Sequence, residues 1–255
     1  TTEIYTLSLH DALPICIVTP SYNMARFLPE TIESVLSQDY PRIQLIVMDG
    51  GSTDGTVEIL KSYGGRIEWV SEKDGGQSDA VNKGFARARG EIFTFLNADD
   101  VYLPGAVQAA VEAFQAHPEV GVVYGDAWYT NEDGQPIKRY PVDPYDYDRL
   151  GTLCFICQPA SFLRAGVWAE MGGLNRDLHL TLDYDLWLRV AKKYPLLKID
   201  RFLANSRMYM DNKTLGRRGE WFREIALITK RHRGYLPLNY LYGYAGYLLY
   251  KEDGF

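Results

Sequence analysis

The segment ICIVTPSYNMARFLPETIESVLSQDYPRIQLIVMDGGSTD, residues 15–54, carries the pattern that decides the fold. Two short apolar runs, residues 15–19 and 43–48, are typical of buried strands. Between them, apolar residues recur at the spacing of a helix: Phe27, Leu28, Ile32, Val35 and Leu36. A strand, a helix and a second strand in this order predict two parallel strands joined by a crossover helix.

The same alternation continues to residue 124. It predicts further strands over residues 67–70, 92–96 and 120–124, and helices over 56–63, 78–89 and from Pro104 onward. We therefore expect an α/β fold with an open, mostly parallel sheet that helices cover on both faces. Beyond Gly125 the pattern is irregular and predicts only a hairpin at residues 131–134 and a helix over 183–194.

Length and charge exclude several classes of protein. The 255 residues, 46% of them apolar and 24% charged, suit one α/β domain with a sizeable core. The net charge of −6 argues against a nucleic-acid partner, which would require a basic face. Three cysteines do not make a disulfide framework, and the C-x-x-C pair Cys154 and Cys157 lacks a second pair for zinc, so we expect buried thiols in the cytoplasm.

Residues 1–15 (TTEIYTLSLHDALPI) lack the basic start and the cleavage site of a signal peptide. They resemble the translation of a sequencing-library adapter, so we expect a non-native segment, with the native sequence entering around Cys16. The alternative is a native strand that contains Leu13, Ile15 and Ile17.

The uncharged segment YLPLNYLYGYAGYLLY, residues 235–250, is too short and too interrupted to cross a membrane. Its tyrosines and leucines follow Lys230, Arg231 and Arg233, a composition found in helices that lie at lipid interfaces. One expectation is therefore a peripheral contact at the inner face of the cytoplasmic membrane. The other is an amphipathic helix packed over the sheet.

Four consecutive strand ends carry polar or glycine-rich loops: TPSYN (residues 19–23), DGGSTD (49–54), SEKDGGQ (71–77) and NADD (97–100). Because the carboxyl ends of parallel strands meet at one edge of a sheet, these loops predict a ligand site there. Neither glycine-rich phosphate-binding motif is present, and the edge is acidic. Carboxylates repel phosphate unless a divalent cation lies between them, so the sequence predicts Mg²⁺ or Mn²⁺ together with a phosphate-bearing ligand.

We expect different roles for the acidic residues at this edge of the sheet. Asp54 precedes a helix, and we favour a capping role for it. Asp49 ends a buried strand, where an unpaired carboxylate is costly, so we favour a functional role. Asp99 and Asp100 are adjacent at a strand end, which favours metal binding over a simple turn.

The segments TPSYN, DGGSTDGT, GGQSDAVNKG and FLNADD resemble those of the family 2 inverting glycosyltransferases, which have the GT-A fold, a Rossmann-like α/β fold. The later segments FICQPASF, LDYDLWLR and NSRMYMDNKT resemble the acceptor half of the same family. The resemblance implies a glycosyltransferase domain over residues 16–215, with a nucleotide-sugar half at 16–125 and an acceptor half at 126–215. A helical, aromatic-rich tail, 216–255, would follow.

The resemblance also implies roles in binding the donor. Pro20 and Tyr22 would frame the nucleobase pocket, and Asp49 would accept a hydrogen bond from a base N–H. Asp79 and Asn82 would face the nucleotide.

The segment Asn97-Ala98-Asp99 stands where the family has its D-x-D motif, and its first residue is an asparagine. Asn97 would therefore meet the ribose through a neutral hydrogen bond, and Asp99 would be the main metal ligand. Asp100 would support Asp99 or meet the sugar. Relatives often carry, near the position of Tyr209, a histidine that approaches the metal or the diphosphate, so the resemblance leaves the third protein ligand open here.

Asp183 would be the catalytic base by resemblance, although Leu182 replaces the family's glutamate before it. From the residues alone, a structural place in the first turn of a helix capped by Thr181 explains Asp183 as well as a base role does. The same structural place is sufficient to explain Asp185, which we leave structural. Trp187 lies one turn beyond Asp183 and either stacks on an acceptor sugar or packs in the core. His179 is a further acceptor-site candidate because it is close to Asp183 in sequence.

The function implied is a metal-dependent inverting transferase of the hexosyltransferase type. It would move a sugar from a nucleoside diphosphate sugar, UDP-linked, to a hydroxyl of a glycan or lipid-linked acceptor in bacterial surface-polysaccharide synthesis. Two alternatives remain open: a sugar-1-phosphate nucleotidyltransferase, which normally has a basic glycine-rich loop after its first strand, and a nucleotide-sugar binding protein without catalysis.

Overall fold

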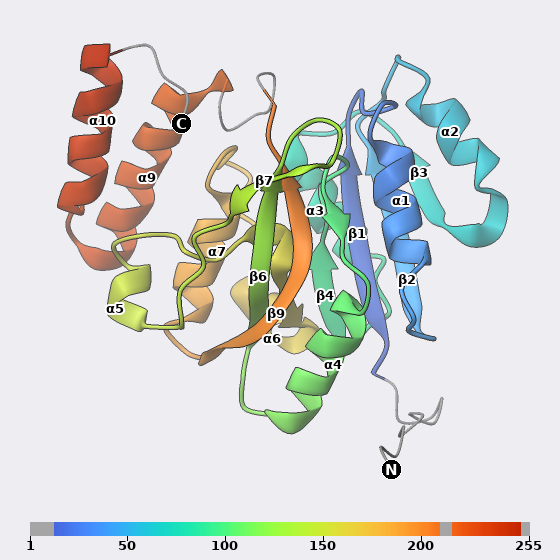
Figure 1. The fold of residues 1–255 in the computed structure, drawn as a ribbon, viewed down its shortest axis with the longest axis horizontal. Helices are drawn as coiled ribbons and strands as arrows, with labels where there is room; N and C mark the ends of the chain where they lie inside the picture. The colour runs from blue at the N-terminus through green and yellow to red at the C-terminus, as the bar shows by residue number, and fades with distance from the viewer. Residues whose placement is uncertain (1–12, 210–215, 251–255) are drawn as a thin grey trace.

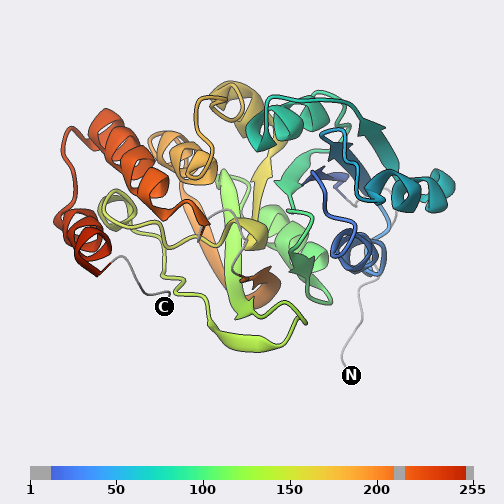
Figure 2. The ribbon, with the colours of Figure 1, turned by 90° about the horizontal axis from the view of Figure 1, so that it is seen from above.

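The computed structural model describes residues 13–209 and 216–250. One curled sheet runs through the molecule, with helices on both of its faces (Figures 1 and 2). Its strand order is β3-β2-β1-β4-β8-β6-β9-β5, and β7 pairs with β6 outside this path. The α/β fold expected from the sequence is therefore confirmed.

The first half is the parallel part of the sheet. It contains β1 (Ile15–Ser21), β2 (Ile43–Asp49), β3 (Glu68–Ser71) and β4 (Ile92–Phe95), connected by α1 (Leu28–Leu36), α2 (Thr56–Ser62) and α3 (Gln77–Phe85). A short 3-10 helix, Gly64–Arg66, follows α2. The register pairs Ser21 with Asp49 and Asp49 with Ser71, so the polar loops leave β1, β2 and β3 side by side.

The second half mixes strand directions. β6 (Val122–Thr130) runs parallel to β9 (Leu196–Arg207) and antiparallel to β7 (Pro136–Arg139) and β8 (Ser161–Arg164), while β5 (Val101–Tyr102) runs antiparallel to β9. The hairpin predicted between β6 and β7 is confirmed. Its turn bonds Gly134 N–H to the Asn131 carbonyl at 3.0 Å, and Gly134 has a φ of 76°, which only glycine adopts freely.

The helices of this half are α4 (Ala106–Ala116), α5 (Tyr147–Leu150), α6 (Ala165–Met171) and α7 (Leu182–Val190), with a 3-10 helix at Gln158–Ala160. α7 is the helix expected over 183–194, and it ends earlier, at Val190. α9 (Arg218–Arg233) and α10 (Leu238–Tyr250) form a hairpin at one end of the molecule, where α9 lies against α7 (Figure 1).

The helix α3 packs closely on the sheet. A Cβ added at Gly84 would lie 2.5 Å from Cγ1 of Val18, so the helix backbone rests directly on β1. This contact holds the first residue of α3, Gln77, over the carboxyl ends of the strands.

The tail helix α10 packs on α9, which corrects the expectation that it covers the sheet. The ring of Phe222 on α9 lies 5.4 Å from that of Tyr244 and 6.1 Å from that of Tyr247. The opposite side of α10 is an apolar stripe open to solvent, formed by Leu238, Leu241, Tyr242, Ala245 and Leu248. Within the described part of the chain, no helix combines the length and apolarity needed to cross a bilayer.

At the other end, Ile15 is fully buried as the first residue of β1, and the Leu13 carbonyl accepts a 2.7 Å hydrogen bond from Tyr40. Residues 1–12 of the segment that resembles an adapter lie outside the described residues, as do residues 210–215 at the end of NSRMYMDNKT.

Candidate active site

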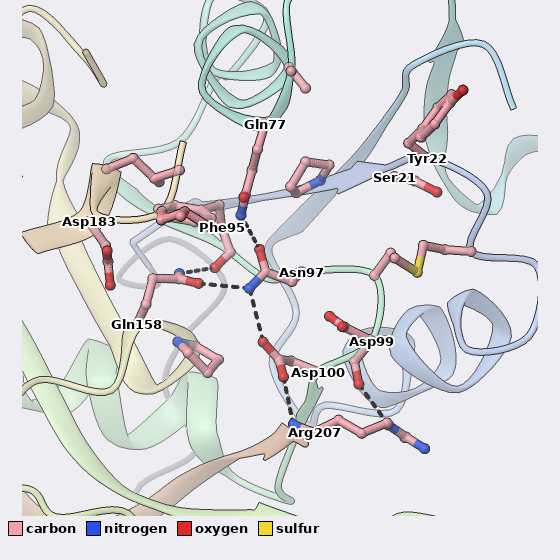
Figure 3. Close-up of a pocket in the computed structure, with 18 of the residues that line it drawn as sticks. Ser21, Tyr22, Gln77, Phe95, Asn97, Asp99, Asp100, Gln158, Asp183 and Arg207 are labelled. Atoms are coloured by element: carbon pink, nitrogen blue, oxygen red, sulfur yellow. Dashed lines mark hydrogen bonds between the residues drawn. The ribbon is translucent and has the colours of Figure 1, made fainter. Parts of the chain in front are cut away.

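A cavity of about 1080 Å³ opens at the carboxyl ends of β1, β2 and β4. It brings together seven of the site residues expected from the sequence: Pro20, Tyr22, Asn97, Asp99, Asp100, His179 and Asp183. Asp183 and Asp99 lie on opposite sides of the group formed by Gln77, Asn97 and Gln158 in Figure 3.

The floor of the cavity is a network of neutral amides. Gln77 donates from Nε2 to Oδ1 of Asn97 at 2.7 Å, and Asn97 donates from Nδ2 to Oδ2 of Asp100 at 3.0 Å (Figure 3). Gln158 donates to the Phe95 carbonyl at 2.5 Å, which anchors its side chain to the end of β4. Asn97 is therefore oriented as a donor toward Asp100. Sequence reasoning missed Gln77 and Gln158, although both lie within segments that carry the family resemblance.

Asp100 connects the NADD loop to β9. Its Oδ1 accepts a 2.9 Å hydrogen bond from the backbone N–H of Arg207, whose Nε donates to the Asp99 carbonyl at 2.9 Å (Figure 3). Burial, with the nearby charge of Asp99, raises the pKa of Asp100 well above its usual value. Since Asp100 is only 4% exposed and already bonded on both oxygens, its observed role is to brace this loop.

Asp99 presents a carboxylate to the cavity. Its Oδ2 accepts a 2.8 Å hydrogen bond from the hydroxyl of Tyr209, and burial raises the pKa of this carboxyl. Among the described residues, no three His, Cys, Asp or Glu side chains cluster as a metal site. The donor set still fits Mg²⁺ or Mn²⁺, because such ions are commonly held by one or two carboxylates, waters and substrate phosphates. Asp99 would be the protein ligand.

Asp183 is the second residue of α7 and lies on the opposite wall with His179, Leu180 and Leu182. Burial, with the nearby charge of Glu224, raises the pKa of Asp183 to about 6. A carboxylate with this pKa is largely ionised at neutral pH and remains basic enough to accept a proton.

The structure decides between the alternatives for two residues of α7 and its N-cap. Trp187 is 1% exposed, packs in the hydrophobic core and does not line the cavity, so the core alternative holds and stacking on an acceptor sugar does not. Thr181 makes no side-chain cap on α7, since its hydroxyl donates to Glu224 at 2.9 Å.

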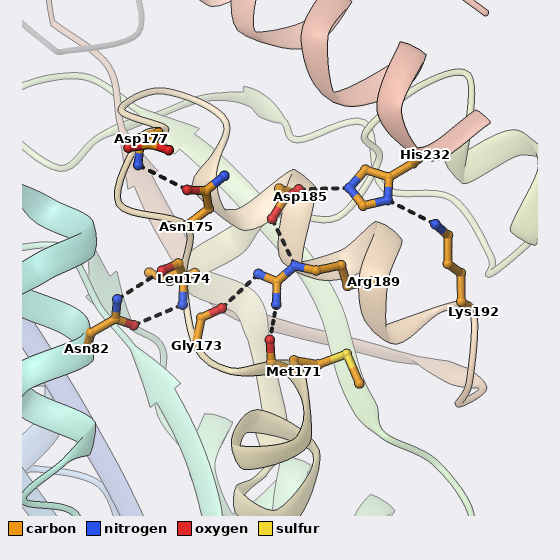
Figure 4. A network of polar contacts seen from close by, with 10 residues as sticks. All are labelled: Asn82, Met171, Gly173, Leu174, Asn175, Asp177, Asp185, Arg189, Lys192 and His232. Carbon is orange, nitrogen blue, oxygen red and sulfur yellow. Dashed lines mark hydrogen bonds and ion pairs between the residues drawn. The ribbon is translucent and has the colours of Figure 1, made fainter. Parts of the chain in front are cut away.

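Three expected nucleotide contacts do not line the cavity. Asp49 is 2% exposed and accepts hydrogen bonds from Ser52 and Ser71, so it holds the loops together. Asp79 accepts from Gly75 N–H at 3.0 Å and pairs with the cations that flank it, Lys83 and Arg176. Asn82 makes a two-way pair with the backbone of Leu174, at 2.9 Å in each direction, and so joins α3 to the second half (Figure 4).

Other structural expectations are confirmed. Asp54 lies one residue before Gly55, the N-cap residue of α2, and bonds the first N–H of the helix, that of Thr56, at 3.1 Å. It also accepts from Ala25 N–H at 2.9 Å. Asp185 is buried and accepts from Arg189 at 2.9 Å and from His232 at 2.8 Å (Figure 4). Cys157 is buried and Cys154 is half-buried. Burial raises the thiol pKa of both well above its usual value, which leaves them unreactive.

The cavity also contains cations that the sequence did not single out as ligand-binding. Lys73 lies in the SEKDGGQ loop, and Arg217 precedes α9; both line the cavity. Their charge suits a phosphate-bearing ligand. Only their position relative to the strand ends reveals them, because isolated lysines and arginines occur throughout the chain.

Curated proteins match this chain in sequence. An uncharacterized glycosyltransferase of Rickettsia conorii is 29% identical over 77% of this chain and 34% of its own length. The chondroitin synthase of Escherichia coli is 26% identical over 79% of this chain and 30% of its own length. The chain thus spans about a third of the length of these curated relatives.

Solved structures give the same architecture. S. aureus TarS 1-349 in complex with UDP-GlcNAc matches with a TM-score of 0.68 and 16% identity over 85% of this chain and 65% of that one. The mannosyltransferase PcManGT from Pyrobaculum calidifontis, in complex with GDP-Man and Mn2+, matches with a TM-score of 0.63 and 19% identity over 84% of this chain and 61% of that one. These likenesses establish the GT-A fold.

The family model for "Glycosyl transferase family 2" matches residues 16–168, more than half of the chain. The match covers the strand-end loops TPSYN, DGGSTD, SEKDGGQ and NADD, from which the cavity is built. The chain belongs to glycosyl transferase family 2.

Proposed function

We propose that this chain transfers a sugar from a nucleoside diphosphate sugar to an acceptor hydroxyl, with inversion at the anomeric carbon. The observation that carries the proposal is the pair of carboxylates, Asp99 and Asp183, on opposite walls of one cavity. Asp99 is suited to hold the cation that binds the leaving diphosphate, and Asp183 is suited to accept the proton of the incoming hydroxyl.

The donor would lie along the strand ends of residues 16–125. Tyr22 is 61% exposed and borders the cavity beside Pro20 and Gly50, so its ring is free to stack on a nucleobase. Lys73 and Arg217 would contact the diphosphate. We propose a UDP-linked sugar, in keeping with the UDP-GlcNAc complex of TarS, whereas the GDP-Man complex of the mannosyltransferase makes GDP the alternative to test.

Asp99 would hold Mg²⁺ or Mn²⁺, oriented by its hydrogen bond from Tyr209. When bound, the cation offsets the charge that develops on the departing diphosphate. Asn97 lines the same cavity, and its amide oxygen would accept a hydrogen bond from a sugar or ribose hydroxyl.

Asp183 would accept the proton of the acceptor hydroxyl. The acceptor oxygen forms a bond to the anomeric carbon from one face while the bond to the diphosphate oxygen breaks on the other. The nucleoside diphosphate leaves with the bonding electrons, and the proton stays on Asp183. General base catalysis of this kind typically contributes ~10²–10⁴-fold.

The acceptor would enter on the side formed by the described residues of the second half, 126–209, with His179 at the rim of the site. Chondroitin synthase and hyaluronan synthase are among the relatives, which supports a glycan or lipid-linked acceptor in surface-polysaccharide assembly.

The apolar stripe of α10 would rest on the inner face of the cytoplasmic membrane. Leu238 is 65% and Tyr242 is 72% exposed on it. Exposed cations on α9, Arg223, Lys230 and Arg231, complement anionic lipid headgroups.

The test is the product released from candidate sugar nucleotides in the presence of Mn²⁺ and candidate acceptors. A glycosyltransferase releases nucleoside diphosphate, a nucleotidyltransferase forms or consumes pyrophosphate, and a binding protein releases neither. We expect nucleoside diphosphate, and loss of turnover in Asp183→Asn with donor binding intact. Full turnover in that variant would refute the base assignment.

A further inference from the structure

The carboxylate of Glu224 on α9 accepts four hydrogen bonds from the chain just before α7. Its Oε1 accepts from His179 N–H at 2.9 Å. Its Oε2 accepts from Leu180 N–H at 2.9 Å, from Thr181 N–H at 3.0 Å and from the Thr181 hydroxyl at 2.9 Å. One side chain thus fixes three consecutive residues that lie 43 to 45 positions away in sequence.

These bonds hold the N-cap residue of α7, Thr181, and the two residues before it, next to the start of the helix. The first N–H groups of a helix have no partner within it, and Thr181, at the N-cap position, makes no capping bond with its own side chain. Glu224 instead supplies a negative charge next to the positive end of the helix dipole. The second residue of this helix is Asp183, so the start of α7 and the carboxylate of Asp183 are set by a residue of the tail.

The segment that Glu224 holds is also part of the cavity wall. His179, Leu180 and Asp183 all line the cavity. A shift of this segment would move Asp183 relative to Asp99 on the opposite wall without touching the strand-end loops that bind the donor.

α9 has other anchors that do not depend on Glu224. Its own residues Ile225 and Ile228 are buried in the same hydrophobic core as the apolar side of α7. His232 donates to Asp185 further along α7 at 2.8 Å, seen in Figure 4. Loss of Glu224 should therefore leave the two helices packed together and change only the start of α7.

We propose that Glu224 is a positioning residue that holds segment 179–181 and thereby fixes Asp183 on the cavity wall. The tail helix α9 is in this way part of the catalytic scaffold. This inference rests on the proposed function, in which Asp183 is the base.

Glu224 also acts on Asp183 through its charge. The groups that interact electrostatically with Asp183 are Glu224 on α9, Tyr240 on α10, Cys154 and Cys157 before β8, and Tyr140 after β7. The tyrosines and thiols are neutral near pH 6 because burial raises the pKa of each. Removal of the Glu224 charge should therefore lower the pKa of Asp183 and move the acid limb of the pH–rate profile to lower pH.

Two variants of Glu224 distinguish its effect on the position of segment 179–181 from the effect of its charge on Asp183. Glu224→Gln keeps the length of the side chain, removes the charge and turns one acceptor into a donor that faces N–H groups. Glu224→Asp keeps the charge but is one methylene too short to reach all four donors. The matched control is Asp148→Asn, which removes another carboxylate contact to α9, that with Arg233.

We expect Glu224→Gln to lower kcat at least tenfold, with the KM for the donor changed less than threefold and the acid limb moved to lower pH. Glu224→Asp should lower kcat with the acid limb unmoved, and Asp148→Asn should match the wild type. Amide hydrogen exchange followed by NMR supplies a readout independent of turnover. Protection at His179, Leu180 and Thr181 should fall in both Glu224 variants and persist in Asp148→Asn.

A folded Glu224→Gln variant with wild-type kcat, pH profile and amide protection would overturn the inference. If Asp183→Asn is inactive while Glu224→Gln behaves as the wild type, this inference alone fails. If Asp183→Asn retains full turnover, the proposed function fails, whatever the exchange data show for segment 179–181.

Discussion

The hydroxyl of Tyr209 donates a 2.8 Å hydrogen bond to Oδ2 of Asp99, although the two residues are 110 positions apart. β9 brings them together by carrying the chain from the second half back to the end of β4. The ring of Tyr209 lies 5.2 Å from that of Phe27, which fixes the hydroxyl in place. The carboxylate proposed as the metal ligand is therefore oriented by a side chain from the opposite half of the fold.

Tyr209→Phe should weaken the response to metal while leaving the fold intact. Loss of a residue that orients a metal ligand typically costs 10–100-fold in metal affinity or activity. We expect the Mn²⁺ concentration for half-maximal rate to rise ~10-fold, measured in a titration at saturating donor. An unchanged Mn²⁺ dependence would show that Tyr209 does not orient the ligand.

The rate should depend on the ionisation of Asp183. With a pKa of about 6, its carboxylate is protonated below that pH and cannot accept a proton from the acceptor. We expect log kcat/KM for the acceptor to be flat near neutral pH and to fall toward unit slope below pH 6. Residual activity in Asp183→Asn should lack this acid limb, and the same limb in that variant would assign it to another group.

Asp185 should be important for stability and not for chemistry. It is buried between Arg189 and His232, and Asp185→Ala leaves both without their carboxylate. We expect a loss of ~3–5 kcal/mol in the free energy of unfolding, measured with urea, since a buried pair is broken. The control is Asp200→Ala, an exposed carboxylate paired with Lys198, which should leave the free energy of unfolding nearly unchanged.

The stabilisation by Asp185 should also depend on pH. Burial alone would raise the pKa of Asp185, but the hydrogen bond from His232 and the charge of Arg189 outweigh it, so the pKa is lowered. A group whose pKa is lower in the folded state stabilises the protein above its unfolded pKa, near 4, and loses that effect as pH falls through the folded value. Unfolding free energy should therefore fall below pH 4 in the wild type, with a smaller change in Asp185→Ala.

The exposed stripe of α10 should bind anionic vesicles. Leu241→Glu puts a charge in the middle of the stripe, and its matched control is Ile137→Glu on β7, an equally apolar residue that is 58% exposed elsewhere. We expect binding to phosphatidylglycerol vesicles in a flotation assay, sensitive to salt and reduced roughly tenfold by Leu241→Glu. Equal binding by both variants, or none by the wild type, would contradict the membrane contact.

The first half of the fold was predictable because each of its signals is local. The apolar runs of β1 and β2, the helical spacing of α1 and the polar loops follow one another along the chain, so short-range periodicity is sufficient. The second half was missed in β8 and β9. β9 mixes charged and apolar residues over twelve positions, and its strand conformation depends on pairing with β6, which is 66 or more residues away.

The site was predictable where a residue's place at a strand end decides its exposure, as for Asn97, Asp99 and Tyr22. It was not predictable for Trp187, Asn82 and Asp79, because the direction of a side chain on its helix decides whether that side chain reaches the cavity. Glu224 could not be found from sequence, because its partners are backbone N–H groups, which leave no mark on the identity of the residues that carry them.

The most direct test of a metal-dependent donor site is a thermal-shift series with UDP, GDP, dTDP and CDP, each with Mn²⁺ and with a chelator. A ligand at a hundred times its dissociation constant adds ~2.7 kcal/mol to the free energy of unfolding, which raises the Tm by several degrees in a domain of this size. We predict that one nucleotide, UDP, raises the Tm with Mn²⁺ and much less with the chelator. No shift with any nucleotide, from a folded sample, would contradict a donor site in this cavity.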